Sequence, residues 1–257
     1  MYKKFFGFTP SECGAHLERL EANAKSGFTL AEVLITLAII GIVAALTIPT
    51  LVSNSQKTQY VTGLKKAYSQ WSQALQKIAV DEGTPGDLKT FFDATEGDTQ
   101  AMGDKLVSYF KIAKNCGTTQ KGCWADTISF KIDGSNPQSG KDYTGDYYRF
   151  VTADGMAVSF YYPYKACSGS FDLTTNICMS AFYIDVNGPK KPNVYGRDIF
   201  QFKIINDHGP AIYPIGGQNM LDWIKSNGCS FGYNGATNKD GEYCAGRVIG
   251  EGWQMNY

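Results

Sequence analysis

Hydrophobic residues change their spacing along this chain, and each spacing predicts a different kind of structure. From Val33 through Gln56 no residue is charged and most are apolar. About 20 predominantly apolar residues are enough for a helix to cross a bilayer, so this run predicts a membrane-spanning helix close to the N-terminus.

After this run the apolar residues recur every three or four positions, which is typical of a helix with one buried face. They are Tyr60, Leu64, Ala67, Tyr68, Trp71, Leu75 and Ile78. We therefore expect one long helix from Phe28 to about Val80, with Pro49 kinking or locally breaking it. Gly83 and Pro85 end the helix, because neither residue continues one readily.

Farther along the chain the apolar residues alternate with a period of two, which is the pattern of β-strands. Asp154-Gly155 and the segment 206–210 each separate two apolar stretches and predict hairpins, while the polar residues 84–100 predict a loop. Strands are expected at residues 127–132, 147–152, 156–162, 181–186, 199–204 and 211–215. Short helices are expected at 104–114 and 219–226. One long helix followed by mostly antiparallel strands predicts an α+β fold.

The charge of the chain is balanced. Its 257 residues include 24 basic and 24 acidic side chains, so the formal net charge is zero. This length leaves room for one good-sized domain with an anchor, or for two small domains. A balanced charge argues against non-specific attraction to nucleic acid or to an anionic membrane surface, although it leaves a specific site open. The sequence therefore gives no strong nucleic-acid signal.

Residues in a catalytic arrangement are not evident. His208 is the single histidine beyond the apolar run, and it lies beside Asp207 in an expected hairpin turn. The sequence contains no G-x-S-x-G, no H-E-x-x-H and no phosphate-binding G-x-x-x-x-G-K-[ST]. We interpret His208 as a surface turn residue and expect no enzymatic activity.

Cysteines are numerous for a chain of this length. Cys13 precedes the apolar run, and the other six of the seven follow it: Cys116, Cys123, Cys167, Cys178, Cys229 and Cys244. We predict that these six pair in the order of the chain, because each pair is close and brackets Gly-rich loop sequence. Free thiols and a zinc site are the alternatives, and zinc is disfavoured because no C-x-x-C occurs. An oxidising compartment would favour the disulfides.

The residues at the start of the apolar run, Lys25-Ser-Gly-Phe-Thr-Leu-Ala-Glu32, point to a family. From Lys25 to about Val52 the sequence resembles the class III leader and N-terminal helix of type IV pilins and type II secretion pseudopilins. The resemblance implies that a prepilin peptidase cuts after Gly27, that the new amine of Phe28 is methylated, and that Glu32 is the assembly carboxylate. A simple signal anchor, with Glu32 at the headgroup level, is the alternative interpretation of this stretch.

Two further residues match the family. Gly41 and Pro49 fall where many type IV pilins carry helix-weakening residues. The resemblance also implies an organisation into four parts. These are a cytoplasmic leader that is removed (1–27), a transmembrane and assembly helix (28–52), the amphipathic half of the long helix (53–82) and a globular α+β head of the pilin fold (83–257), with disulfide-bonded loops.

The resemblance implies a place and partners as well. We expect a single-pass protein of the bacterial inner membrane, with its head on the periplasmic or extracellular side, that becomes extracellular when it is assembled into a filament. Its partners would be prepilin peptidase, other pilin or pseudopilin subunits and the inner-membrane assembly platform. We favour a structural subunit of a pilus or pseudopilus. The alternative is a minor pilin-like, membrane-anchored module that serves DNA uptake or recognises a substrate or surface.

One segment of the head is distinctive. Residues 185–198 resemble a D-x-N-G-P-x-x-P-N-x-x-G-x-D loop found in many prepilin-type proteins. The oxygens of Asp185, Asn187 and Asp198 suit calcium, and some pseudopilins bind calcium in a head loop. The segment departs from the EF-hand pattern, and Lys190 with its neighbour Lys191 works against a dication. The alternative is a turn in which the Asp and Asn side chains bond the backbone.

Overall fold

The computed structural model describes residues 27–118, 122–135, 137–139, 147–161, 167–171, 174–215, 229 and 241–257. The chain divides into two compact units, Met1–Pro49 and Thr50–Tyr257. Nearly all of the expected leader and all of the helix expected at 219–226 lie outside the described residues.

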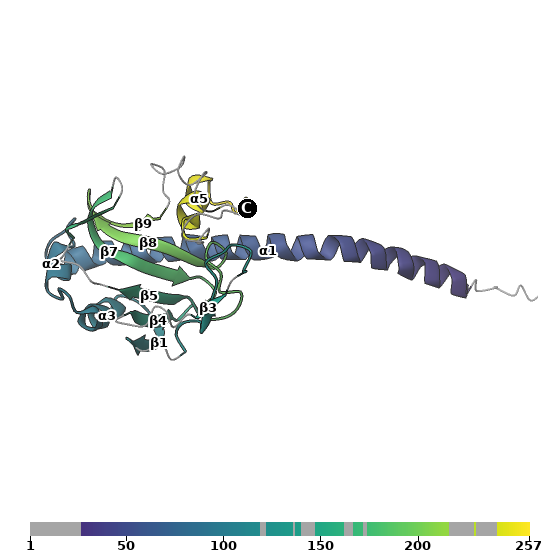
Figure 1. Ribbon diagram of the computed structural model, residues 1–257, viewed down its shortest axis with the longest axis horizontal. Coiled ribbons are helices and arrows are strands. Elements are labelled where there is room, and N and C mark those ends of the chain that lie inside the picture. The colour runs from purple at the N-terminus through teal and green to yellow at the C-terminus, as the bar shows by residue number, and fades with distance from the viewer. Residues whose placement is uncertain are drawn as a thin grey trace, which may run out of the picture. The chain divides into compact units, whose positions relative to one another are not determined.

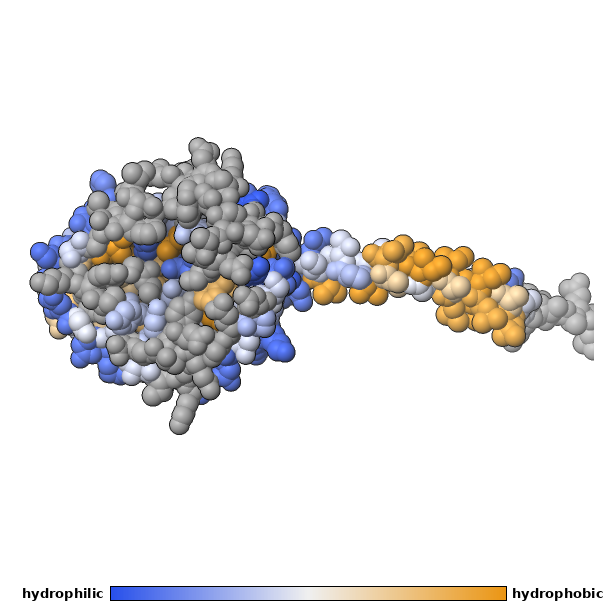
Figure 2. Space-filling view, in the orientation of Figure 1, coloured by the Kyte–Doolittle hydropathy of each residue, from blue (hydrophilic) through white to orange (hydrophobic). Residues whose placement is uncertain are grey.

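The long helix expected from the sequence is present as α1 (Leu30–Asp81), a single helix of 52 residues. It continues through Pro49 without a break, and the boundary between the two units falls directly after this proline. Its N-terminal part is long and apolar enough to cross a membrane, and none of that part is buried. Figure 2 shows this part of α1 as a nearly continuous apolar surface.

An antiparallel sheet of seven strands forms the centre of the second unit (Figure 1). Along the sheet the strand order is β1-β4-β5-β7-β8-β9, and β6 pairs with β7. The strands are β1 (Ile112–Gly117), β4 (Tyr148–Thr152), β5 (Ala157–Tyr161), β6 (Gly169–Phe171), β7 (Thr174–Asp185), β8 (Ile199–Asn206) and β9 (Pro210–Pro214). Both expected hairpins are present, since β4 pairs with β5 and β8 pairs with β9.

The segment between α1 and the sheet differs from the prediction. Helix α2 (Lys89–Asp93) and the first two residues of α3 (Thr99–Val107) lie within the expected loop. Helix α3 starts earlier than predicted because the Asp98 carboxylate accepts a hydrogen bond from the Ala101 N–H and caps it. It also ends earlier, so Ile112 lies in β1 and not in a helix.

Other boundaries also differ from the prediction. The strand expected at 127–132 is reduced to β2 (Thr127–Ile128), which pairs with the short β3 (Gln138–Ser139). Strand β7 begins seven positions before the expected start at 181. The Cys-rich tail contains a helix that was not predicted, α5 (Cys244–Gly250).

One face of the sheet packs on the second half of α1, and their side chains form the main core. Trp71 is 2% exposed. Its ring centroid lies 4.4 Å from that of Phe110 and 4.3 Å from that of Phe182 on β7. Leu64, Leu75 and other positions of the predicted apolar stripe are buried in the same cluster. This packing confirms the α+β fold in which a long helix supports an antiparallel sheet.

Candidate functional site

The expected cleavage site lies in an open position. Gly27 and Phe28 precede α1, and the Phe28 side chain is 88% exposed. A Cβ built on Gly27 would meet no other atom within 4 Å. The described residues therefore leave the peptide bond between Gly27 and Phe28 accessible to a protease.

Glu32 closes the first turn of α1. Its Oε2 atom accepts hydrogen bonds from both the Thr29 N–H and the Thr29 hydroxyl, each at 2.8 Å. The Glu32 N–H donates in return to the Thr29 hydroxyl at 3.2 Å. These reciprocal bonds form a capping box, which the spacing Thr29-x-x-Glu32 could have predicted. Both bonds that Glu32 accepts from Thr29 use Oε2, so this capping leaves Oε1 available to a further partner.

The loop between β7 and β8 brings Asp185 and Asp198 together. Asp185 ends β7, and Asp198 directly precedes β8. The Val186 N–H donates to the Asp198 carbonyl at 2.9 Å, and Asp185 pairs in register with Ile199. Both aspartates are 0% exposed, so two carboxyl groups are buried close to each other.

Backbone donors satisfy part of these carboxylates. The Asp198 carboxylate accepts from the N–H groups of Asn193 at 2.8 Å and Val194 at 2.7 Å, and Asp185 Oδ1 accepts from the Asn187 N–H at 3.2 Å. Such bonds are typical of a turn in which Asp and Asn side chains bond the backbone, which is the alternative to a metal site. They do not account for every oxygen in the loop.

Three buried oxygens of the loop have no hydrogen-bond partner among the described residues: Asp185 Oδ2, Asn187 Oδ1 and Asn193 Oδ1. Burial raises the pKa of Asp185 well above its usual value, and the nearby Asp198 raises it further. Burial also raises the pKa of Asp198, although its backbone hydrogen bonds oppose this shift. A hard cation such as calcium prefers oxygen ligands, and buried oxygens that accept no hydrogen bond are suited to this role. Asn193 belongs to this set, and the sequence did not single it out.

Comparison with protein families identifies the motif at the N-terminus. Residues 22–48 match the family model described as the prokaryotic N-terminal methylation motif. The chain carries the signature of the type IV pilins and pseudopilins. Comparisons with curated proteins and with solved structures give no match.

The match covers part of the features expected at the N-terminus. It includes the positions of Gly27, Phe28, Glu32 and Gly41, and it ends just before Pro49. A Cβ built on Gly41 would meet no other atom within 4 Å. Gly41 therefore leaves a position without a side chain on the exposed surface of α1. The backbone of α1 stays helical at both Gly41 and Pro49.

The cysteines of the second unit form three disulfides. They join Cys116 to Cys123, Cys167 to Cys178 and Cys229 to Cys244, which are the sequential pairs expected from the spacing. The described residues contain no group of three or more His, Cys, Asp or Glu side chains that could hold a metal ion. The pairing leaves no thiolate of these six cysteines for a zinc site.

His208 has the position expected of a surface residue. It lies in the turn between β8 and β9, its side chain is 96% exposed, and its Nδ1 is 3.3 Å from a carboxylate oxygen of Asp207. This arrangement gives it no buried or oriented setting of the kind that general acid–base catalysis uses.

Proposed function

We propose that this protein is a structural subunit of a type IV pilus or of a type II secretion pseudopilus. One observation carries the proposal: the methylation motif opens a helix whose large apolar side chains are uncovered. These include Leu34, Ile35, Leu37, Ile39, Ile40, Ile42, Val43, Leu46, Ile48 and Leu51, which are 53–74% exposed. So much contiguous apolar surface requires lipid or a protein partner. The bilayer would cover this surface before assembly, and the helices of neighbouring subunits would cover it afterwards.

Cleavage would couple these two states. Removal of residues 1–27 creates a positive amine on Phe28, and this amine exists only in the processed chain. Glu32 lies one helical turn from that amine and keeps Oε1 free of the capping bonds. Inside a filament the Glu32 carboxylate of one subunit would pair with the Phe28 amine of the next, while the apolar faces of 28–52 supply the bulk of the contact.

Surface shearing of the native bacterium tests this function. We expect the processed protein in the sheared filament fraction if it serves a pilus, or in envelope complexes with other subunits if it serves a pseudopilus. In a strain without prepilin peptidase, the unprocessed protein should stay in the membrane. A processed protein that is found as a monomer alone would contradict the proposal.

We further propose that the head loop holds calcium. Four side chains would supply the oxygens, since three of them carry a buried oxygen that has no hydrogen-bond donor in the described part of the chain. The four are Asp185, Asn187, Asn193 and Asp198. Lys190 and Lys191 are exposed, so their charges lie at the surface and not among the buried oxygens. Bound calcium would supply the positive charge that two adjacent buried carboxylates lack.

Calcium should therefore raise the melting temperature of the full-length protein in detergent. At about 100 times the dissociation constant, a ligand of the folded state contributes about 2.7 kcal/mol, which corresponds to about 5–10 °C for a domain of this size. An Asp185→Asn variant should lose the response, while Asp133→Asn, which changes an exposed carboxylate, should keep it. An unchanged wild-type melting temperature would leave the loop as an ordinary turn.

Acid should weaken this calcium response. Because the native loop raises the pKa of Asp185 and Asp198, the folded chain binds protons more tightly there than the unfolded chain. Without calcium, these two groups thus lower stability as the pH rises above their unfolded pKa. Protons and calcium compete for the same carboxylates, so the calcium-induced shift should be smaller at about pH 5 than at pH 7.5.

A further inference from the structure

The β7–β8 loop ends in a tight turn, residues 193–199, whose hydrogen bonds close on themselves. The Gly196 N–H donates to the Ile199 carbonyl at 2.9 Å, and the Asp198 N–H donates to the Val194 carbonyl at 3.2 Å. The Asp198 carboxylate accepts in return from the Val194 N–H at 2.7 Å. The conformation of this turn therefore depends on the state of the Asp198 carboxylate.

The turn lies directly against the segment 241–257, which includes helix α5. A Cβ built on Gly196 would lie 2.5 Å from the Cys244 sulfur, and a Cβ built on Gly241 would overlap the Tyr195 carbonyl. Side chains at these two glycines would push the turn and the segment apart. The fit between the two parts is thus close enough to depend on the conformation of the turn.

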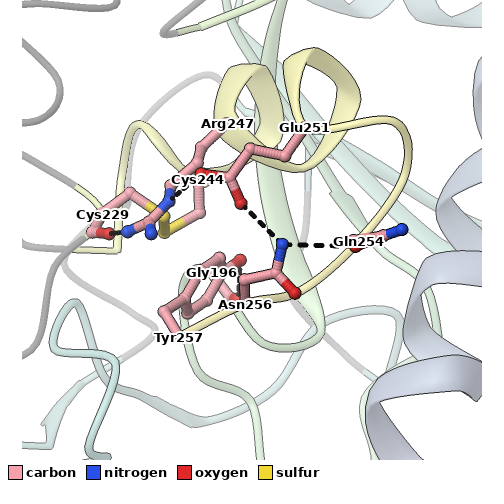
Figure 3. A network of polar contacts seen from close by, with 8 residues as sticks. All are labelled: Gly196, Cys229, Cys244, Arg247, Glu251, Gln254, Asn256 and Tyr257. Carbon is pink, nitrogen blue, oxygen red and sulfur yellow. Dashed lines mark hydrogen bonds and ion pairs between the residues drawn. A yellow bond between two sulfur atoms is a disulfide. The ribbon is translucent and has the colours of Figure 1, made fainter.

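Polar contacts hold the segment over the turn (Figure 3). The Tyr257 hydroxyl donates to the Gly196 carbonyl at 2.7 Å. The Arg247 guanidinium lies 5.2 Å from the centre of the Tyr257 ring, and it also donates to the Cys229 carbonyl. These contacts connect the disulfide of Cys229 and helix α5 to one carbonyl of the turn.

The turn also contributes to the proposed calcium site. Asp198 belongs to it, and Asp185 is buried nearby at the end of β7. Asp185 Oδ2 and Asn193 Oδ1 are buried without a hydrogen-bond partner in the described part of the chain. Adjacent buried carboxylates are costly unless a cation compensates them. A cation held by these oxygens would therefore stabilise the turn conformation on which the segment 241–257 fits.

We propose that calcium in the β7–β8 loop controls the docking of the segment 241–257 on the head. This inference rests on the calcium site proposed above. With calcium bound, the turn presents the Gly196 carbonyl to Tyr257 and leaves room for Cys244. Without calcium, the turn leaves this conformation more often and the segment opens. Because coupling between two binding events is reciprocal, the docked segment also tightens the binding of calcium.

Reduction of the three disulfides in the full-length protein in detergent tests this coupling at single bonds. Cys229 and Cys244 are both 0% exposed, so dithiothreitol reaches their bond only when the segment opens. Calcium chloride at about 1 mM should slow this reduction about threefold or more relative to EGTA, as followed by alkylation and mass spectrometry. The disulfides that begin on β1 and end on β7 are internal controls and should keep their rates.

Three variants extend the test. Asp185→Asn should remove the effect of calcium on the reduction. Tyr257→Phe lacks the hydroxyl that bonds the Gly196 carbonyl, so by reciprocity it should bind calcium about threefold more weakly in titration calorimetry. Tyr161→Phe is the matched control and should bind calcium like the wild type. Tyr161 lies at the end of β5 away from the loop, since Ala157 is the residue of β5 that pairs with Asp185.

The outcomes separate the coupling from the calcium site itself. Calcium that binds but leaves the reduction of the Cys229–Cys244 bond unchanged would contradict the coupling and keep the site. Equal slowing at all three disulfides would also contradict the coupling, because calcium would then stabilise the head as a whole. A wild-type protein that binds no calcium in the calorimeter would contradict both the site and the coupling.

Discussion

A Glu32→Val protein is expected to enter the membrane and fold its head, yet to be incorporated into filaments at a tenth of the wild-type level or less. A carboxylate in the hydrocarbon of a membrane is costly, by about 2.5–3.5 kcal/mol at the helix centre and less near an end. Before assembly, Glu32 can reach the interface, because it lies in the first turn of α1. In a filament it needs a cation, and the Phe28 amine of a neighbour would supply one. Loss of about 1.4 kcal/mol per contact already changes an equilibrium tenfold.

The capping box complicates this substitution, so controls are needed. Valine removes both the charge and the bonds to Thr29. Glu32→Gln keeps a side chain that can complete the capping box but removes the charge, and we expect it to fail in assembly as well. Thr29→Ala weakens the cap and keeps the charge, so it should assemble. Incorporation is measured as the ratio of filament-bound to membrane-bound protein.

Normal assembly of both Glu32 variants would leave this residue as a helix cap on a membrane anchor. Failure of Thr29→Ala together with success of Glu32→Gln would assign the effect to the cap and not to the charge.

Trp71→Ala is expected to lower the stability of the head more than any surface change. Trp71 is 2% exposed and contacts Phe110 and Phe182, so its removal leaves a large cavity between α1 and the sheet. Truncation of a buried tryptophan costs about 3–5 kcal/mol, which corresponds to a fall in melting temperature of about 6–20 °C for a domain of this size. Near-UV circular dichroism of the full-length protein in detergent can follow the transition.

Gln73→Ala is the matched control, because Gln73 lies two positions along the same helix and is exposed. It should shift the melting temperature by no more than a degree or two, since surface changes usually stay within about 0.5 kcal/mol. Equal shifts for the two variants would mean that the second half of α1 does not support the sheet.

Sequence periodicity could predict the parts of the fold whose burial is one-sided and regular. The stripe from Leu64 to Ile78 has the spacing of a helix and is buried against the sheet. The prediction from periodicity was wrong between α3 and β1, where four apolar residues also fit a helical spacing. They are Leu106, Val107, Phe110 and Ile112. There the Ala153 N–H donates to the Lys111 carbonyl at 2.7 Å, and the segment pairs with β4 instead of continuing the helix. Tertiary pairing decides such a boundary, and a local pattern does not contain it.

The candidate site shows the same division. The motif around Gly27 and Glu32 is contiguous in the sequence, so residue identity alone could predict it. The capping box between Thr29 and Glu32 could also have been predicted from their spacing. Asn193 could not be chosen in this way. Its proposed role rests on a side-chain oxygen that is buried without a hydrogen-bond donor among the described residues, and on a left-handed backbone with φ of 55°. Both features depend on how the loop folds over Asp185 and Asp198.

The intact mass of the protein extracted from the membrane of its native bacterium tests the central claim most directly. Our account predicts the mass of a chain that begins at Phe28, ends at Tyr257 and carries one methyl group on its N-terminal amine. This result would mean that the motif is processed and that the mature protein keeps its apolar helix. A mature chain that begins beyond Pro49, or one that retains residues 1–27, would contradict the account.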